Sequence, residues 1–300
     1  MQERHWGLNN ELDSCWVETG KPPIIRRIRR SPPQDVRLIL YKEVQTLGKN
    51  GNSYAKIRRE IEKRHRVRLS KATISGWITG KSSPSNAGHV FVPTKKPELA
   101  YVIGVKAGDA SLNVKPDTYQ YRIRLQAVDR EFVEAFNHAV AKVLGCPPHR
   151  LWKGNTAAET HVEFGSYLLH KFLQQSLRIL KPYIEHCRKC TAAFLRGFFD
   201  SEGCVDTLGV LTASNSDLEL LDYVRYLLVK YFDIETTGPH LGTRKGNLIT
   251  RRGKSYRRRR NCHSIYVRRD SRERFYRGIG LTIVRKSYRL EKSLGITESD

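Results

Sequence analysis

Residues 98–111 read ELAYVIGVKAGDAS, and residues 191–204 read TAAFLRGFFDSEGC. Both stretches are mostly apolar, carry a glycine near the middle, and end in an acidic residue between small ones. When the central glycines are aligned, Asp109 falls on Glu202, 93 residues later. A pattern that recurs with so long a period predicts a duplicated structural unit.

The segments that follow the two stretches also match. Residues 119–126 read YQYRIRLQ and residues 209–214 read GVLTAS, and each segment has the composition of a strand before a helical pattern. In this alignment, Gln126 falls on Thr212. The two copies therefore share a strand as well as a motif.

Each copy also closes on an Arg-Lys pair, at 188–189 in the first and at 285–286 in the second. Motif, strand, helix and closing pair thus recur together. We therefore expect one repeat at 98–189 and a second at 190–300.

Gly104 and Gly197 lie inside helical patterns, where a glycine costs about 1 kcal/mol relative to alanine. We expect a packing reason: the two helices cross closely at their glycines and bring Asp109 and Glu202 together. Two adjacent carboxylates either bind a divalent cation or shift their pKa values. Oxygen ligands favour a hard ion such as Mg²⁺, and such an ion on a basic protein favours phosphodiester hydrolysis. The alternative is that the acids are ordinary helix-end residues, and Asp200 is expected to be a spectator.

The charge balance points to a polyanionic partner. The 300 residues hold 54 Lys and Arg against 30 Asp and Glu, a net charge of +24, and basic side chains bind phosphates through counterion release. An anionic membrane surface is the competing partner, but the sequence has neither a cationic amphipathic helix nor a spanning apolar stretch. It also shows no secretory signal, so we expect a cytoplasmic protein that associates with the nucleoid through DNA.

The N-terminal third predicts three segments: a basic, flexible tail at 1–33, a helix-turn-helix unit at 34–80 and a linker at 81–97. Ser53 and Ser70 are placed to cap the second and third helices of the unit. A short third helix opened by polar residues resembles the recognition helix of helix-turn-helix proteins. The alternative is a three-helix spacer. The resemblance presents three side chains to DNA base edges: Lys71, Thr73 and Ser75.

Strand alternation predicts a polar face made of Gln120, Arg122, Arg124 and Gln126. Arginine and glutamine side chains suit the major-groove edges of guanine and adenine, although a half-buried strand with a solvated face is the alternative. Residues 241–260 hold nine Lys or Arg and no acid, which favours a β-hairpin with a long loop along the DNA backbone. The basic side chains assigned to DNA there and in the next strand are Arg257, Arg258, Arg259, Arg260 and Arg268.

The six cysteines are expected to be reduced thiols. Cys187 and Cys190 form a CxxC pair, but a zinc site needs a second pair of ligands. Neither Cys146 nor Cys262 shows a convincing spacing for this role, so the sequence does not predict zinc.

The segments VIGVKAGDA (102–110) and LRGFFDSEG (195–203) resemble the two signature motifs of the single-chain LAGLIDADG homing endonucleases. The resemblance implies an α+β fold of two pseudo-symmetric αββαββα repeats, whose sheets form a saddle over DNA. It also implies catalytic acids at Asp109 and Glu202. Mg²⁺ or Mn²⁺ would bind at these acids and at the residues that follow them, Ala110 and Gly203. Ala110 departs from the family, which usually has glycine there.

The resemblance extends to other site residues and to function. It assigns basic residues near the cleavage site to Lys189 and Lys286, and a polar residue that orients water to Gln126. It implies a monomeric endonuclease that makes a metal-dependent double-strand break in double-stranded DNA. The alternatives are a catalytically inactive DNA-binding regulator and a maturase acting in intron RNA splicing. Neither end resembles a protein-splicing junction, which favours a free-standing or intron-encoded enzyme.

Overall fold

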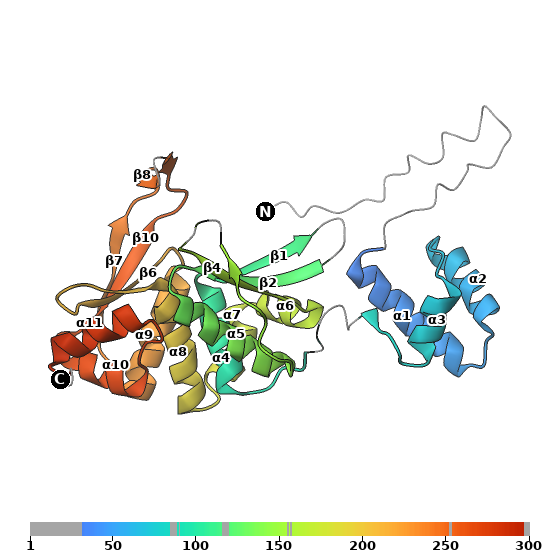
Figure 1. Ribbon diagram of the computed structural model, residues 1–300, viewed down its shortest axis with the longest axis horizontal. Coiled ribbons are helices and arrows are strands. Elements are labelled where there is room, and N and C mark those ends of the chain that lie inside the picture. The colour runs from blue at the N-terminus through green and yellow to red at the C-terminus, as the bar shows by residue number, and fades with distance from the viewer. Residues whose placement is uncertain are drawn as a thin grey trace.

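The computed structural model describes residues 32–84, 89, 91–115, 120–154, 156, 158–251 and 254–296. The tail expected at 1–33 therefore lies almost wholly outside the described residues. The described chain forms an N-terminal group of helices and a larger α+β body (Figure 1).

The N-terminal group consists of α1 (Gln34–Lys49), α2 (Tyr54–His65) and α3 (Lys71–Ile78). The predicted caps are confirmed, because the side chains of Ser53 and Ser70 accept backbone N–H groups at the starts of α2 and α3. These N–H groups have no partner within their own helices, so each serine stabilises the first turn.

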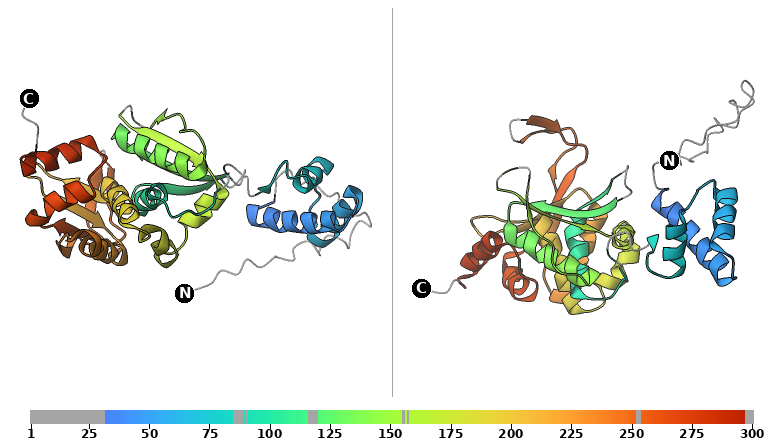
Figure 2. Two further views of the ribbon diagram at one scale, coloured as in Figure 1. Left: turned by 90° about the horizontal axis from the view of Figure 1, so that it is seen from below. Right: turned by 45° about the vertical axis from the view of Figure 1, so that its right-hand side comes forward.

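The three helices have a hydrophobic core of their own, separate from that of the α+β body, and they lie to one side of it (Figure 2). Contacts with the body come from Asp35, whose carboxylate accepts a hydrogen bond from Tyr167 and lies 4.0 Å from Lys171 Nζ. The buried members of the N-terminal core are Leu40, Val44, Ile57, Ile61, Leu69, Ile74 and Trp77.

The first repeat has the predicted order αββαββα, followed by one further helix. Its strands form one antiparallel sheet in the order β1-β2-β4-β3. The elements are α4 (Pro97–Ala107), β1 (Ser111–Lys115), β2 (Gln120–Ala127), α5 (Arg130–Leu144), β3 (Trp152–Lys153), β4 (Thr160–Gly165), α6 (Tyr167–Leu173) and α7 (Leu177–Ile184).

The second repeat has the same order and the equivalent sheet, β5-β6-β10-β7. Between β7 and β10 the short antiparallel ribbon β8-β9 is inserted, which confirms the hairpin expected within 241–260. The elements are α8 (Arg188–Glu202), β5 (Gly203–Val205), β6 (Leu211–Asn215), α9 (Leu218–Phe232), β7 (Thr236–Thr243), β8 (Leu248–Arg251), β9 (Lys254–Arg257), β10 (Cys262–Val267), η3 (Arg269–Ser271), α10 (Arg272–Gly278) and α11 (Val284–Leu294). Because α8 begins at Arg188, the second repeat starts two residues before the expected boundary.

The two repeats share one hydrophobic core, and helices α4 and α8 lie side by side at its centre (Figures 1 and 2). Phe194 and Phe198 of α8 are fully buried there, as are Leu99 and Val102 of α4. Burying an apolar side chain of this size stabilises a fold by about 1.5–3 kcal/mol. The repeats therefore fold as one unit around the helix pair, with the sheets on one side of it.

The sheet registers correct the alignment of the two repeats. Ser111 pairs with Arg124, and Gly203 pairs with Ala213. If each register is extended by one or two residues, Gln126 lies opposite Asp109 and Ser214 lies opposite Glu202. The prediction that Thr212 corresponds to Gln126 is therefore wrong by two residues. The reason is a longer hairpin in the first repeat, where Gln126 follows Asp109 by 17 residues while Ser214 follows Glu202 by 12, and an alignment of short motifs does not fix where this difference falls.

Within the described part of the chain, no helix is long and apolar enough to cross a membrane.

Candidate active site

The crossing of α4 and α8 explains the two helical glycines. A Cβ atom at Gly104 would lie 2.2 Å from the carbonyl oxygen of Phe194, and one at Gly197 would lie 2.5 Å from that of Tyr101. Both distances are far below van der Waals contact, so only glycine permits this approach of the two backbones. The predicted packing reason for the glycines is confirmed.

The same crossing brings the two acidic ends together. Gly108 ends α4, and a Cβ atom there would lie 2.9 Å from Cγ of Glu202 and 3.1 Å from its Oε1. Asp109 follows Gly108 and is exposed, whereas Glu202 is half-buried at the end of α8. Burial and, second, the charge of Asp109 raise the pKa of Glu202 to about 7, while Lys286 opposes the rise. The two carboxylates therefore interact, as the sequence predicts.

The side chain of Lys286 caps the C-terminal end of α8. It is only 4% exposed, and its Nζ donates hydrogen bonds to the carbonyl oxygens of Phe199 at 3.1 Å and Asp200 at 2.6 Å. The last carbonyls of a helix have no partners within it, and an ammonium group satisfies them well. Burial lowers the pKa of Lys286. The sequence-based placement of this lysine beside Glu202 agrees with the structure.

The N-terminal end of α11 is anchored on the other repeat. Arg285 binds the carboxylate of Asp129 with two hydrogen bonds, Nε to Oδ1 at 2.6 Å and Nη2 to Oδ2 at 2.8 Å. The backbone N–H of Val284 also donates to Glu131 at 3.0 Å. Paired hydrogen bonds of this kind fix direction as well as distance. The position of Lys286 therefore depends on the first repeat.

Lys189 does not lie at the acid pair. It is exposed in the first turn of α8, whereas Glu202 is the last residue of the same helix. Thirteen residues of α-helix separate them by about 20 Å, at a rise of 1.5 Å per residue. The prediction that Lys189 is the counterpart of Lys286 is therefore wrong, because the two Arg-Lys pairs lie at different ends of the helix layer.

Asp200 is buried next to the acid pair, with an exposure of 1%. Its carboxylate accepts hydrogen bonds from the Tyr101 hydroxyl at 3.1 Å and from the Thr282 backbone N–H at 2.8 Å. Burial raises its pKa, against the opposing effect of these hydrogen bonds and of Lys286. Asp200 therefore joins α8 to α4 and to the segment before α11, and its contacts are structural.

Gln126 on β2 takes part in a chain of polar contacts. Its Nε2 donates to Glu159 Oε2 at 2.8 Å, and its Oε1 accepts from Arg124 Nη2 at 2.6 Å. In the second repeat, Ser214 instead bonds Ser264 on the neighbouring strand, with 2.7 Å between the hydroxyl oxygens. The polar surroundings of the two sheets thus differ.

Ala110 and Gly203, the residues after the acids, have different environments. Ala110 is buried and its N–H bonds the carbonyl of Val105, whereas Gly203 is half-buried and begins β5. A Cβ atom at Gly203 would lie 2.3 Å from the carbonyl oxygen of Phe199. The second repeat therefore requires glycine at this point, while the first accommodates alanine.

The alternation predicted for β2 is confirmed. Ile123 and Leu125 are fully buried, whereas Gln120 is exposed and Arg122 half-buried on the opposite face. Arg122 contacts Glu163 of β4 at 2.9 Å. This face of β2 therefore presents arginine and amide groups, with the carboxylate of Glu163 on the adjacent strand paired to Arg122.

The other residues assigned to DNA lie on two separate parts of the molecule. Arg257, Arg259 and Arg260 are exposed at the end of the inserted ribbon, with Arg258 half-buried among them, and Arg268 is exposed beyond β10. Lys71 is exposed at the start of α3, whereas Thr73 and Ser75 are half-buried. The Thr73 hydroxyl lies 2.8 Å from that of Ser70, so it contributes to the cap.

Comparison with known proteins agrees with the fold and the motif. Residues 189–280, which lie within the second repeat, match the family model of the LAGLIDADG-like domain. The chain is also 34% identical over 263 residues to the uncharacterized protein MJ0398 of Methanocaldococcus jannaschii, covering 87% of this chain and 95% of that protein. The chain therefore belongs to the same family as this archaeal protein.

Similar solved structures include two kinds of protein. The homing endonuclease I-DmoI in complex with DNA and Mn has a TM-score of 0.45 and 16% identity, over 62% of this chain and 98% of that one. Full-length DUF199/WhiA from Thermatoga maritima has a TM-score of 0.42 and 16% identity, over 70% of this chain and 64% of that one.

Proposed function

We propose that this protein is a DNA endonuclease that makes a Mg²⁺-dependent double-strand break. The observation that carries the proposal is the meeting of Asp109 and Glu202 at the ends of the crossed helices. Burial and, second, the charge of Asp109 raise the pKa of Glu202, so ionising both carboxylates at this site has a cost. A divalent cation bound by their oxygens would remove that cost, and Mg²⁺ or Mn²⁺ suits an all-oxygen ligand set.

The residues of the chain have distinct roles in this proposal. Asp109 and Glu202 would hold the cation, which supplies activation of water and stabilisation of the leaving oxygen. Lys286 is a positioning residue, because its amine is occupied by the carbonyls of Phe199 and Asp200. Gln126 is proposed to orient the attacking water on the first repeat, from a side chain held by Glu159.

The distribution of positive charge supports DNA as the substrate. The polar face of β2 and the ribbon β8-β9 carry arginines, and the chain has a net charge of +24. Contacts of this kind on DNA phosphates position a protein, while arginine and glutamine on a strand read base edges. The helix-turn-helix unit would supply a second, separate contact with the duplex.

The test compares cleavage by the wild-type protein and an Asp109→Asn/Glu202→Gln double variant. Plasmids carrying a library of random target sites, together with the coding locus lacking any intervening element, are incubated with Mg²⁺ or with EDTA. The wild type is expected to linearise a defined subset only with Mg²⁺. The double variant is expected to bind the same sites without cutting them.

The matched control is Glu219→Gln/Asp233→Asn, which removes the same charge from two exposed positions at the ends of α9. It is expected to cut like the wild type. A break that survives the Asp109/Glu202 double substitution would refute the assignment. Site-specific binding by the wild type without any Mg²⁺-dependent break would instead identify a regulator, and selective binding of intron RNA would identify a maturase.

A further inference from the structure

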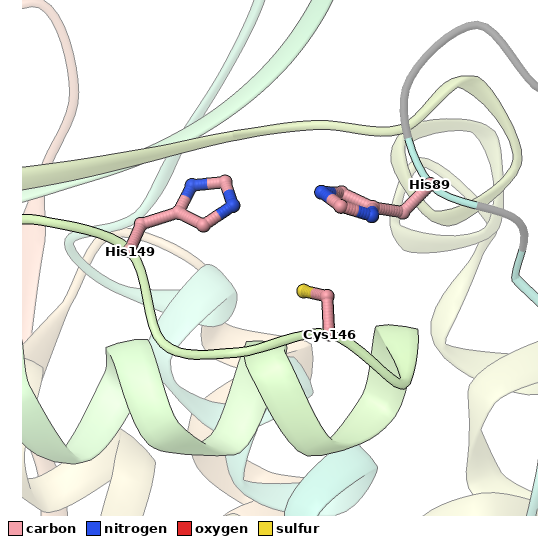
Figure 3. Close-up of side chains that lie close together, drawn as sticks. All are labelled: His89, Cys146 and His149. Atoms are coloured by element: carbon pink, nitrogen blue, oxygen red, sulfur yellow. The ribbon is translucent and has the colours of Figure 1, made fainter.

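The structure brings together three side chains that are far apart in sequence: His89, Cys146 and His149. One ligand atom from each, an imidazole nitrogen or the thiol sulfur, lies within 4.8 Å of the other two. Figure 3 shows the two imidazole rings facing each other, with the Cys146 sulfur below the space between them. Among the described residues this is the one group of three that could hold a metal ion in this way.

The hydrogen bond that His149 makes through Nδ1 leaves its Nε2 available to bind a metal ion. Its Nδ1 lies 2.9 Å from the carbonyl oxygen of Glu163, which can only accept, so Nδ1 must carry the hydrogen. In the neutral ring, Nε2 then holds the lone pair. Histidines that bind metals generally donate their other N–H to a carbonyl or carboxylate in this manner. The ring is also stacked on the buried Phe164, with centroids 4.0 Å apart.

The backbone of His149 is fixed by Asn137 of α5, a side chain that is only 4% exposed. Asn137 donates from Nδ2 to the His149 carbonyl at 2.7 Å and accepts from the His149 N–H at 2.8 Å. Two prolines separate His149 from Cys146, and proline restricts both its own φ and the preceding residue. The spacing of these two groups is therefore set before any ligand binds.

Cys146 and His89 are held as firmly by their own backbones. Gly145 ends α5 with a positive φ of 64°, and the Cys146 N–H bonds the carbonyl of Ala141 at 3.0 Å, which is a Schellman-type helix end. The N–H of His89 donates to Gly165 at 3.0 Å, and its carbonyl accepts from Ser166 Oγ at 2.9 Å. Each of the three groups thus comes from a segment with defined hydrogen bonds.

We propose that His89, Cys146 and His149 form a Zn²⁺ site that ties the linker at 81–97 to the first repeat. Two imidazoles and a thiolate are borderline-soft ligands, which favour Zn²⁺ over the Mg²⁺ preferred by carboxylates. Tetrahedral Zn²⁺ places such ligand atoms about 3.3–3.6 Å apart, and the three atoms already lie within 4.8 Å of one another. Three protein ligands leave the fourth position for water.

The tie has a consequence for the two parts of the molecule. His89 lies between the helix-turn-helix unit, which ends near Gly80, and α4, which begins at Pro97. A metal ion bound by His89 would add a side-chain link to the first repeat, beside the backbone hydrogen bonds of His89 to Gly165 and Ser166. Zn²⁺ would therefore act on the placement of the N-terminal helices and not on the carboxylate pair.

The experiment uses the metal-free full chain and Co²⁺ as a spectroscopic probe, without oxygen. The wild type is expected to bind one Co²⁺ with a thiolate-to-cobalt charge-transfer band and intense visible bands of tetrahedral geometry. Stoichiometric Zn²⁺ is expected to displace it, whereas excess Mg²⁺ is not. The readout is binding, so it is independent of DNA cleavage.

Two variants test the ligands. Cys146→Ser is expected to abolish the charge-transfer band. His89→Ala, which changes only the linker, is expected to weaken Zn²⁺ binding by at least about tenfold, because even substitutions outside the ligand shell cost about 10- to 100-fold. Circular dichroism establishes that each variant is folded.

The matched control is Cys187→Ser, which removes an exposed thiol whose Sγ lies 3.5 Å from that of Cys190. Its cobalt spectrum is expected to match that of the wild type. The proposal is overturned if the wild type shows no charge-transfer band or if the band survives in Cys146→Ser. It is also overturned if Cys187→Ser loses the band, or if His89→Ala binds Zn²⁺ as tightly as the wild type.

Discussion

The two repeats have the same element order and the same strand order, yet their acids lie in different surroundings. Glu202 is half-buried, with the amine of Lys286 behind it at the end of α8. Asp109 is exposed, and the polar chain around Gln126 lies on the adjacent strand. Close helix packing constrains both glycines equally, because each backbone blocks the other. The polar surroundings come from other elements, α11 beside Glu202 and β2 beside Asp109, so they can differ.

The largest expected effect tests the shared part, the helix crossing. Gly104→Ala places a methyl group 2.2 Å from a backbone oxygen that cannot move aside locally. We expect a loss of about 3 kcal/mol or more in the free energy of unfolding, since overpacking of a core is costly. Urea denaturation of the full chain measures it.

The control for the crossing is Gly165→Ala in β4, where a Cβ atom would meet nothing within 4 Å. Its free energy of unfolding is expected to change by less than about 1 kcal/mol. Equal stabilities for the two variants would contradict the close crossing.

The second prediction concerns the two lysines that the sequence treats as equivalent. Lys286→Met leaves the carbonyls of Phe199 and Asp200 without their donor and removes a charge near the buried Asp200. We expect a loss of about 2–3 kcal/mol in the free energy of unfolding. Lys189→Met, on the exposed first turn of the same helix, is expected to change it by no more than about 0.5 kcal/mol. Chemical denaturation measures both changes. Equal losses in the free energy of unfolding for the two variants would contradict the different environments of the two lysines.

The third prediction concerns pH. The pKa of Glu202 is raised from 4.5 to about 7, so its ionisation costs the folded state stability as the pH rises through this range. Without divalent cations, Glu202→Gln is expected to match the wild type at pH 4.5. By pH 8 it should exceed the wild type by about 1–3 kcal/mol, a range that allows for partial solvent access.

Denaturation curves in EDTA at several pH values measure this difference. Addition of Mg²⁺ at pH 8 is expected to stabilise the wild type more than the variant. A difference between the two proteins that does not change with pH would contradict the raised pKa of Glu202.

The smallest expected effect concerns the difference between the sheets of the two repeats, and this prediction depends on the proposed function. Gln126→Ala is expected to slow the cutting of one DNA strand by up to about tenfold, because the loss of one hydrogen bond costs about 0.5–1.5 kcal/mol. Ser214→Ala, at the equivalent register position, is expected to have less effect because its hydroxyl bonds Ser264. Nicking and linearisation of a supercoiled plasmid resolve the two steps, and equal slowing by both variants would remove the asymmetry.

Several features of the fold could be predicted from the residues alone. The spacing of Gly104 and Gly197 predicted the helix crossing, alternation predicted the buried face of β2, and Ser53 and Ser70 predicted two helix starts. The crossing was predicted from the repetition of one motif, whereas the buried face and the helix starts depend on a period or a cap that spans a few residues. Such patterns act through short-range geometry, so they can be interpreted without knowledge of the remainder of the chain.

Which distant groups meet could not be predicted from the residues and follows from the folded arrangement. Lys286 lies at the C-terminal end of α8 and Lys189 at its start, although the sequence aligns them. The sheet register makes Ser214, and not Thr212, the counterpart of Gln126. The folded arrangement also brings His89 of the linker to Cys146 and His149, across 57 residues that no ligand spacing connects. The physical reason is common to all three. Loop lengths, strand registers and helix packing set these contacts, and none of them is expressed in the order of neighbouring residues.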